Sequence, residues 1–138
     1  MGEIVTDSSV ILAWYFDDEV DDYAISVLNA LVEQTPVVPS VCPLELGNSL
    51  LVAARRGRIT LDESVGILKD LSEMQIRVEQ EPPARMLNEV FVLARDHQLS
   101  TYDASYLDLA MRRDLPLATL DKSLQRAAGK LGVPLFTC

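Results

Sequence analysis

Short apolar runs alternate along the chain with longer segments of helical periodicity. The first run, Ile4-Val5-Thr6, leads directly into Asp7, Ser8 and Ser9, which are residue types that cap helices. Further runs that predict strands lie at residues 36–39, 75–79, 117–120 and 135–136. The pattern therefore predicts a sheet of about five short strands.

The segments between these runs carry apolar residues three and four positions apart, which is the spacing of one helix face. Helices are predicted over residues 10–16, 21–33, 41–57 (capped by Ser40) and 61–72, then from Pro82-Pro83 through Ala94, from Asp103 onward, and from Asp121 to Gly132. Strands separated by helices are typical of a parallel sheet with helices on both faces. The predicted fold class is α/β, as one domain spanning residues 1–138.

Composition narrows the possible classes of protein. The longest apolar run, residues 10–16, is too short to cross a bilayer, and the N-terminus lacks the features of a signal peptide. Cys42, Cys138 and the single histidine, His97, make neither a disulfide framework nor a metal-type cluster. These features predict a cytoplasmic protein. The net charge of −9 argues against a broad basic surface for nucleic acids, although a site for divalent cations must itself be acidic.

Two acidic residues come directly after predicted strands. Asp7 follows the first strand and Asp121 follows the strand at 117–120. Ligands of parallel α/β sheets bind at the carboxyl ends of the strands, so both side chains should lie at the same edge of the sheet. Each could also serve as a simple helix cap.

A third acid, Glu45, lies in a helix that is otherwise apolar. Between residues 41 and 54 the polar residues are Glu45, Asn48 and Ser49, and Glu45 is the only charged one. Because an isolated buried carboxylate is costly, Glu45 must either find a partner, as in a buried ion pair, or lie at the mouth of a site. Asn48 is one turn away on the same face and is expected to orient Glu45 by a hydrogen bond.

A fourth acid, Asp103, aligns with Tyr106, Leu107 and Ala110 on the apolar stripe of its helix. It should therefore face the sheet, although capping is again an alternative. Asp108 falls on the opposite side of this helix and is predicted to be solvated.

Four neighbouring carboxylates cannot all stay ionised without compensation, because like charges raise one another's pKa. A divalent cation supplies that compensation, and Mg²⁺ and Mn²⁺ prefer oxygen ligands. Such an ion can activate water for the hydrolysis of a phosphodiester.

The motifs around these four acids resemble the acidic signature of PIN-domain nucleases. The motifs are VTDSSV around Asp7, PLELGNSLL around Glu45, LSTYDASYLDLA around Asp103 and LATLDKSL around Asp121. Their order and spacing in one small domain resemble in particular the VapC toxins of bacterial toxin–antitoxin pairs. The resemblance spans essentially the whole chain.

The resemblance implies a PIN-like domain that acts as a Mg²⁺- or Mn²⁺-dependent endoribonuclease. It assigns all four acids to metal binding and catalysis, with Asp7 and Asp103 as direct ligands, while Glu45 and Asp121 complete the pocket and position water.

The resemblance also implies supporting residues and partners. Thr119 matches a hydroxyl position of the family, and Asn48 fits its Glu-x-x-Asn helix. The implied partners are an RNA substrate, a second copy of the chain in a homodimer, and a small antitoxin protein whose C-terminal segment covers the active site.

Basic residues gather in three places: Arg55-Arg56-Gly57-Arg58, Arg112-Arg113, and Lys122 with Arg126 and Lys130. They are either solvated helix ends or contacts to RNA phosphates beside the acidic pocket. Tyr102 or Tyr106 could stack on a base, with core packing favoured for Tyr106.

Three other functions remain open. A phosphatase with Asp7 as nucleophile usually has a second acid two residues on, where this chain has Ser9. A phosphoacceptor receiver domain needs an aspartate on a middle strand, whereas the run at 75–79 ends in Glu79-Gln80-Glu81. The third is a PIN-fold RNA-binding or regulatory module without catalysis, against which the presence of all four acids argues.

Overall fold

The computed structural model describes residues 2–16 and 21–137. Its four strands, β1 (Glu3–Thr6), β2 (Thr35–Pro39), β3 (Arg77–Glu79) and β4 (Leu117–Ala118), form one parallel sheet in the order β3-β2-β1-β4. Val5 of the central strand β1 is in register with Val37 on one side and Leu117 on the other. The predicted α/β class with a parallel sheet is confirmed.

The predicted number of about five strands is slightly too high for the described part of the chain. The run at residues 135–136 forms only an isolated parallel bridge, between Leu135 and Leu117. The runs predicted at 75–79 and 117–120 are also longer than the observed β3 and β4. Leu120 and Asp121 leave the sheet because Asp121 already caps the next helix.

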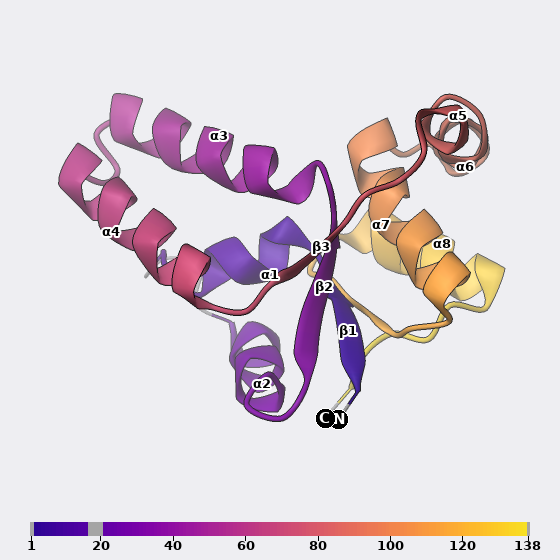
Figure 1. The fold of residues 1–138 in the computed structure, drawn as a ribbon, viewed down its shortest axis with the longest axis horizontal. Coiled ribbons are helices and arrows are strands. Elements are labelled where there is room, and N and C mark those ends of the chain that lie inside the picture. Colours follow the sequence, from indigo (N-terminus) through magenta and orange to yellow (C-terminus); the bar gives the residue numbers. More distant parts are fainter. Residues whose placement is uncertain (1, 17–20, 138) are drawn as a thin grey trace.

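Eight helices of the described residues flank this sheet. Figure 1 shows α1 to α4 on one side of the sheet and α5 to α8 on the other. Their bounds are α1 (Ser8–Ala13), α2 (Asp22–Ala30), α3 (Cys42–Arg55), α4 (Leu61–Glu73), α5 (Pro83–Met86), α6 (Glu89–His97), α7 (Thr101–Arg113) and α8 (Lys122–Leu131). The predicted helices thus exist, except that the apolar segment 10–16 is helical only to Ala13 and the one from Pro82-Pro83 is split in two.

The split between α5 and α6 changes the expected packing. Asn88 leaves the helical region, with φ −131° and ψ −82°, and so separates the two helices. Asn readily takes such positions because its side chain competes with helical backbone hydrogen bonds. Val90 and Ala94 are buried as the periodicity predicts, but Leu87 and Phe91 are 83% and 56% exposed.

Helix α7 is the most deeply buried helix of the molecule. Residues 104–110 are all buried, and α7 packs against β1, β2 and β4. Tyr106 and Leu107 join Val5 in the core on this face of the sheet, while Ile4 faces the other way and joins the core beneath α1 and α2. The alternation along β1 therefore places α7 directly under the sheet.

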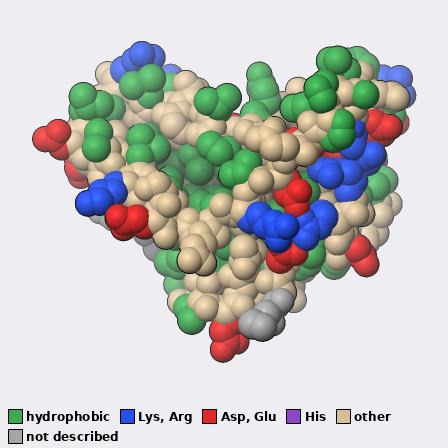
Figure 2. All heavy atoms as spheres, viewed as in Figure 1, with side chains coloured by type: hydrophobic (Ala, Val, Ile, Leu, Met, Phe, Trp, Pro, Cys, Tyr) green, Lys and Arg blue, Asp and Glu red, His purple; other side chains and the backbone are tan. Residues whose placement is uncertain are grey.

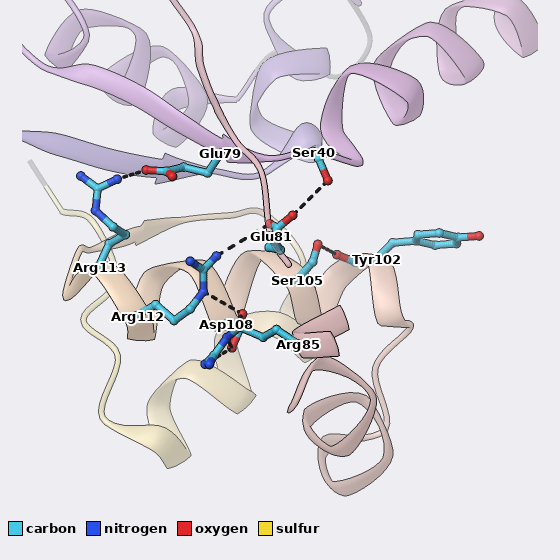
Figure 3. A network of polar contacts seen from close by, with 9 residues as sticks. All are labelled: Ser40, Glu79, Glu81, Arg85, Tyr102, Ser105, Asp108, Arg112 and Arg113. Carbon is cyan, nitrogen blue, oxygen red and sulfur yellow. Dashed lines mark hydrogen bonds and ion pairs between the residues drawn. The ribbon is translucent and has the colours of Figure 1, made fainter. Parts of the chain in front are cut away.

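The prediction that Asp108 is solvated is wrong. Asp108 is 2% exposed and receives Arg85, through hydrogen bonds of 2.8–3.1 Å, and Arg112, at 3.0 Å (Figure 3). Helical periodicity identifies the face of α7 opposite the sheet, but α5 and the segment before it cover that face. A buried carboxylate with two arginines is a far less costly arrangement than one without a partner.

The same arginine connects α7 to the start of α3. Arg112 lies 3.8 Å from Glu81, and Glu81 accepts a 3.0 Å hydrogen bond from the hydroxyl of Ser40 (Figure 3). Ser40 was expected to cap the following helix, but its hydroxyl is used here and Val41 occupies the cap position of α3. This chain of contacts ties the β3–α5 connection to both α7 and the β2–α3 turn.

Arg113 makes a separate tie at the sheet. Its guanidinium donates to Glu3 of β1 at 2.5 Å and to Glu79 of β3. Arg112 and Arg113 are therefore not simply solvated, because both side chains are bound to carboxylates of their own chain.

No helix in the described part of the chain is long and apolar enough to cross a membrane. The acidic run Asp17-Asp18-Glu19, whose composition predicts a turn after the first helix, lies outside the described residues.

Candidate active site

Asp7 lies where the central strand ends. The register of Thr6 with Ala118 continues one residue further, where the amide of Asp7 donates to the carbonyl of Ala118 at 2.9 Å. Asp7 and Thr119 therefore leave neighbouring strands at the same edge of the sheet. The carboxylate of Asp7 is 3% exposed.

Two hydroxyls bind one oxygen of the Asp7 carboxylate at short distance. Ser9 and Thr119 each donate to its Oδ2 at 2.7 Å. Asp7 makes no capping hydrogen bond from its side chain to α1, so its position before a helix is not used for capping. The expectation that Thr119 supports the site agrees with this geometry.

Ser9 and Thr119 also bind the segment that follows β4. The Thr119 hydroxyl accepts the amide of Asp121 at 3.0 Å, and the Ser9 hydroxyl accepts the amide of Leu120 at 3.1 Å. Sequence reasoning missed this role of Ser9. The position of Ser9 could have indicated it. A hydroxyl two residues after an aspartate at the end of a strand can reach that aspartate's carboxylate and also the loop that follows the neighbouring strand.

Asp121 is the acid for which the capping alternative is correct. Its Oδ1 accepts the amide of Leu124 at 3.0 Å at the start of α8. Its charge nevertheless reaches the site, since it contributes to raising the pKa of both Asp7 and Asp103.

Glu45 reaches the same place from the first turn of α3. Its Oε1 accepts a 2.6 Å hydrogen bond from the hydroxyl of Tyr106 on α7. The expected hydrogen bond between Asn48 and Glu45 is absent from the described part of the chain. Glu45 also makes no ion pair with any described residue, so the alternative of a buried ion pair is wrong. Tyr106 is fully buried, as the sequence predicted. Its hydroxyl donates the hydrogen bond to Glu45, a contact that was not predicted from the sequence. A buried Tyr hydroxyl usually has a hydrogen-bond partner, so this contact could have been expected.

Asp103 extends from the first turn of α7, which Ser100 caps by accepting the Asp103 amide at 3.0 Å. Its helix begins at Thr101, two residues before the predicted start. Asp103 is partly buried, and this burial, together with the charges of Asp7 and Asp121, raises its pKa to about 6.

The four acids thus converge electrostatically. Burial raises the pKa of Asp7, and the charge of Asp121 adds to it, while the Ser9 and Thr119 hydroxyls oppose the rise. Burial also raises the pKa of Glu45, with contributions from Asp7 and Asp103 and opposition from the Tyr106 hydrogen bond. Concentrated negative charge of this kind favours a cation.

The donor set fits a hard divalent cation. Within residues 2–16 and 21–137, no three His, Cys, Asp or Glu side chains lie close enough to hold an ion by themselves. Mg²⁺ does not need such a cage, since it typically binds one or two carboxylates and keeps several waters. Asp7 and Asp103 could supply those carboxylates. Their raised pKa values mean that the ionised forms are destabilised in the free site, and a bound cation would stabilise these ionised forms.

An open hollow adjoins Glu45. It has a volume of about 410 Å³ and is lined by Ser8, Val41, Leu44, Glu45, Asn48, Ser49 and Tyr102. Figure 2 shows the molecular outline indented between the lobe of α3 and α4 and the lobe of α5 to α7. Asn48 and Tyr102 are exposed at this hollow, where they can contact a ligand without moving the core.

Nucleophilic chemistry at a cysteine is excluded in this region. Cys42 is a buried free cysteine beside Tyr106, and burial raises the pKa of its thiol to about 12. A thiol with that pKa is protonated at neutral pH and is therefore a poor nucleophile.

The raised pKa of Asp103 predicts a pH-dependent stability. Folding moves the pKa of this carboxyl from 3.8 to about 6, so between these values the folded state binds more protons than the unfolded state. The contribution of Asp103 to the free energy of unfolding therefore falls as pH rises through this window and is level above it. We expect Asp103→Asn to gain stability relative to the wild type as pH rises, in urea unfolding with EDTA. An advantage that shrinks with rising pH would contradict this.

Comparison with protein families defines the class of this molecule. Residues 4–130 match the PIN domain, which covers the sheet, all four acids and nearly the whole chain. The chain therefore belongs to the PIN-domain family.

Known relatives then define its type. Ribonuclease VapC3 from Pyrobaculum aerophilum is 30% identical over 132 residues, which cover 96% of this chain and 99% of the relative. The crystal structure of PAE2754 from the same organism is 28% identical with a TM-score of 0.68, covering 92% of this chain and 87% of that one. VapBC2 from Rickettsia felis, solved with a DNA fragment from their promoter, has a TM-score of 0.65 and covers 99% and 98%, but at 12% identity it supports the fold alone. The protein is a VapC-type member of the family, as the motifs predicted.

Proposed function

We propose that this protein is a metal-dependent endoribonuclease that acts as the toxin of a toxin–antitoxin pair. The observation that carries the proposal is the convergence of Asp7, Glu45, Asp103 and Asp121 at one edge of the sheet, where burial and neighbouring negative charge raise the pKa of Asp7, Glu45 and Asp103. The similarity to Ribonuclease VapC3 over nearly the whole chain supports RNA as the substrate.

In this proposal Asp7 and Asp103 bind Mg²⁺ or Mn²⁺, which would activate a water and neutralise charge on the scissile phosphoryl group. The hydroxyls of Ser9 and Thr119 fix the Asp7 carboxylate in one orientation before any ligand arrives. Glu45, held by Tyr106 at its Oε1, has its other oxygen available to accept a proton from water or to orient that water. Asp121 adds negative charge without leaving its cap position.

The proposed partners rest on the VapC type of the chain, which the relative Ribonuclease VapC3 supports, and the VapBC2 structure is only an example of the same fold. VapBC2 was solved with promoter DNA, and we propose that this chain likewise acts with a small antitoxin, and that it forms a homodimer. Expression in cells should arrest growth, and co-expression of the neighbouring small open reading frame should relieve the arrest. Unaffected growth together with intact RNA would refute the toxin role.

Removal of metal tests the enzymatic part of the proposal. Protein stripped with EDTA should leave structured RNAs intact, and added Mg²⁺ or Mn²⁺ should restore cleavage. Asp103→Asn, purified identically, controls for contaminating nucleases and should stay inactive with metal. Cleavage that persists in EDTA, or in the variant, would refute the mechanism.

Two other results would favour the alternative functions. Hydrolysis of p-nitrophenyl phosphate with intact RNA would favour a phosphatase, and RNA binding without cleavage would favour a non-catalytic module.

A further inference from the structure

Helix α8 exposes a row of cations that the proposed mechanism does not use. Lys122, Arg126 and Lys130 lie four positions apart, so their side chains fall along one helix face over about 12 Å. All three are exposed, whereas Leu124 on the opposite face is fully buried. We call these three residues the α8 basic row.

The α8 basic row is not neutralised by the protein itself. Five arginines of the described chain pair with its own carboxylates: Arg77, Arg85, Arg95, Arg112 and Arg113. The three cations of the row make no ion pair with any described residue. No Asp or Glu follows Asp121 in the sequence. In a protein of net charge −9, this helix is a local exception.

The position of Lys122 argues against a purely structural reason for the row. It is the first residue of α8, where the helix dipole disfavours a positive charge. Helix stability would therefore gain from almost any other polar residue at this position. Lys122 is also adjacent to Asp121, so the row begins at the acidic site and leads away from it.

The far end of the row borders a polar hollow. Arg126 and Lys130 line a space of about 160 Å³ together with His97, Gln98 and Ser123, all of which can donate hydrogen bonds. The one acid lining it, Asp96, is paired with Arg95 at 2.9 Å. A phosphate group would meet several donors in this hollow.

We propose that the α8 basic row binds the phosphodiester backbone of the RNA substrate as it extends from the acidic site. This inference rests on the proposed function. Four carboxylates alone repel a polyanion, so a nuclease with such a site needs cations nearby to hold its substrate. Helix α8 begins at Lys122, four residues after the end of β4, and Figure 1 shows it beside α7. RNA backbone bound along α8 would therefore lead directly to the acids.

Salt-dependent RNA binding tests this surface. In an Asp7→Asn background, which keeps the RNA intact, the variant carrying Lys122→Gln, Arg126→Gln and Lys130→Gln is compared by fluorescence anisotropy with a labelled single-stranded RNA. Loss of three phosphate contacts should reduce the slope of log affinity against log salt by about 2 and weaken binding about 10-fold or more at low salt.

A matched control removes the same charge elsewhere. Arg55, Arg56 and Lys69 also make no ion pair with any described residue, and they lie on α4 and at the end of α3. Neutralising these three with Gln should change affinity by no more than about twofold, because they lie on the other side of the sheet from α8 (Figure 1) and salt screens exposed charges at such separations. Equal losses in both triple variants, or an unchanged slope in the α8 variant, would overturn the proposal.

Two further arms separate other outcomes. If the α8 variant keeps its RNA affinity but loses affinity for poly-glutamate, the row takes an acidic protein segment and the proposal is wrong. Wild-type protein that cleaves RNA, together with an α8 variant that binds RNA equally well, refutes this inference alone. Wild-type protein that does not cleave RNA with Mg²⁺ or Mn²⁺ refutes the proposed function instead.

Discussion

Replacing Asp7 by asparagine should abolish RNA cleavage and at the same time make the protein more stable. Changing residues that only support a metal ligand typically costs 10–100-fold in affinity or activity, so loss of a proposed direct ligand should cost more than about 100-fold. Asparagine can still accept the Ser9 and Thr119 hydrogen bonds through its Oδ1 in place of the carboxylate Oδ2. The loss of cleavage would therefore reflect charge and not a collapsed site.

The gain in stability follows from the electrostatics of the free site. Burial of the Asp7 carboxylate, with the Asp121 charge nearby, raises its pKa, so the charged form is destabilised at neutral pH. Removing that charge should raise the free energy of unfolding in EDTA by about 0.5–2 kcal/mol, the range common for a single stabilising substitution. Mg²⁺ should stabilise the wild type and not Asp7→Asn. A variant that is both inactive and less stable than the wild type would show that Asp7 has a structural role.

Arg112→Met should be the most destabilising of the charge substitutions. Among the described residues, Arg112 is the arginine that pairs with both Asp108 and Glu81, whose side chains are only 2% and 1% exposed. Methionine retains most of the side-chain volume but leaves two buried carboxylates with less positive charge. Breaking a buried ion pair by removing one partner typically costs 3–5 kcal/mol, and we expect a loss of about that size in urea unfolding.

Arg95→Met is the matched control for this prediction. Its ion pair with Asp96 lies at the surface, with side chains 63% and 50% exposed, and such pairs contribute at most about 1 kcal/mol. Combining Arg112→Met with Asp108→Asn and Glu81→Gln should recover part of the lost stability. Similar decreases in the free energy of unfolding for Arg112→Met and Arg95→Met would contradict the prediction, because the contacts of Arg112 with Asp108 and Glu81 would then stabilise the fold no more than a surface ion pair does.

Much of this site could be predicted from sequence because each acid follows a local rule. Asp7 and Asp121 come directly after apolar strands, and parallel pairing then brings them to one edge. Glu45 and Asp103 stand out because a charged side chain on an apolar helix face is costly to bury unless it has a partner or a ligand. These signals depend on residues close in sequence.

What sequence reasoning missed depends on contacts between distant segments. Asp108 lies on the outer face of its own helix, and the segment that covers it carries Arg85, which is 23 residues away in the sequence. Tyr106 reaches Glu45 across 61 residues, and Ser9 reaches Leu120 across 111. Periodicity describes which face of a helix is apolar, but it carries no information on what other segments lie against the polar face.

The pairing of β1 with β4 has a consequence for protein synthesis. The Asp7 carboxylate and its partner Thr119 lie 112 residues apart in the chain. A nascent chain emerges from its N-terminus, so Asp7, Glu45 and Asp103 leave the ribosome before Thr119 and Asp121 do. The central strand β1 pairs with β4 only after residues 117–118 have been synthesised. The Asp7 carboxylate likewise gains its hydrogen bond from Thr119 only at that stage. Products that terminate before residue 119 therefore lack both the Thr119 hydroxyl that binds the Asp7 carboxylate and the fourth acid, Asp121.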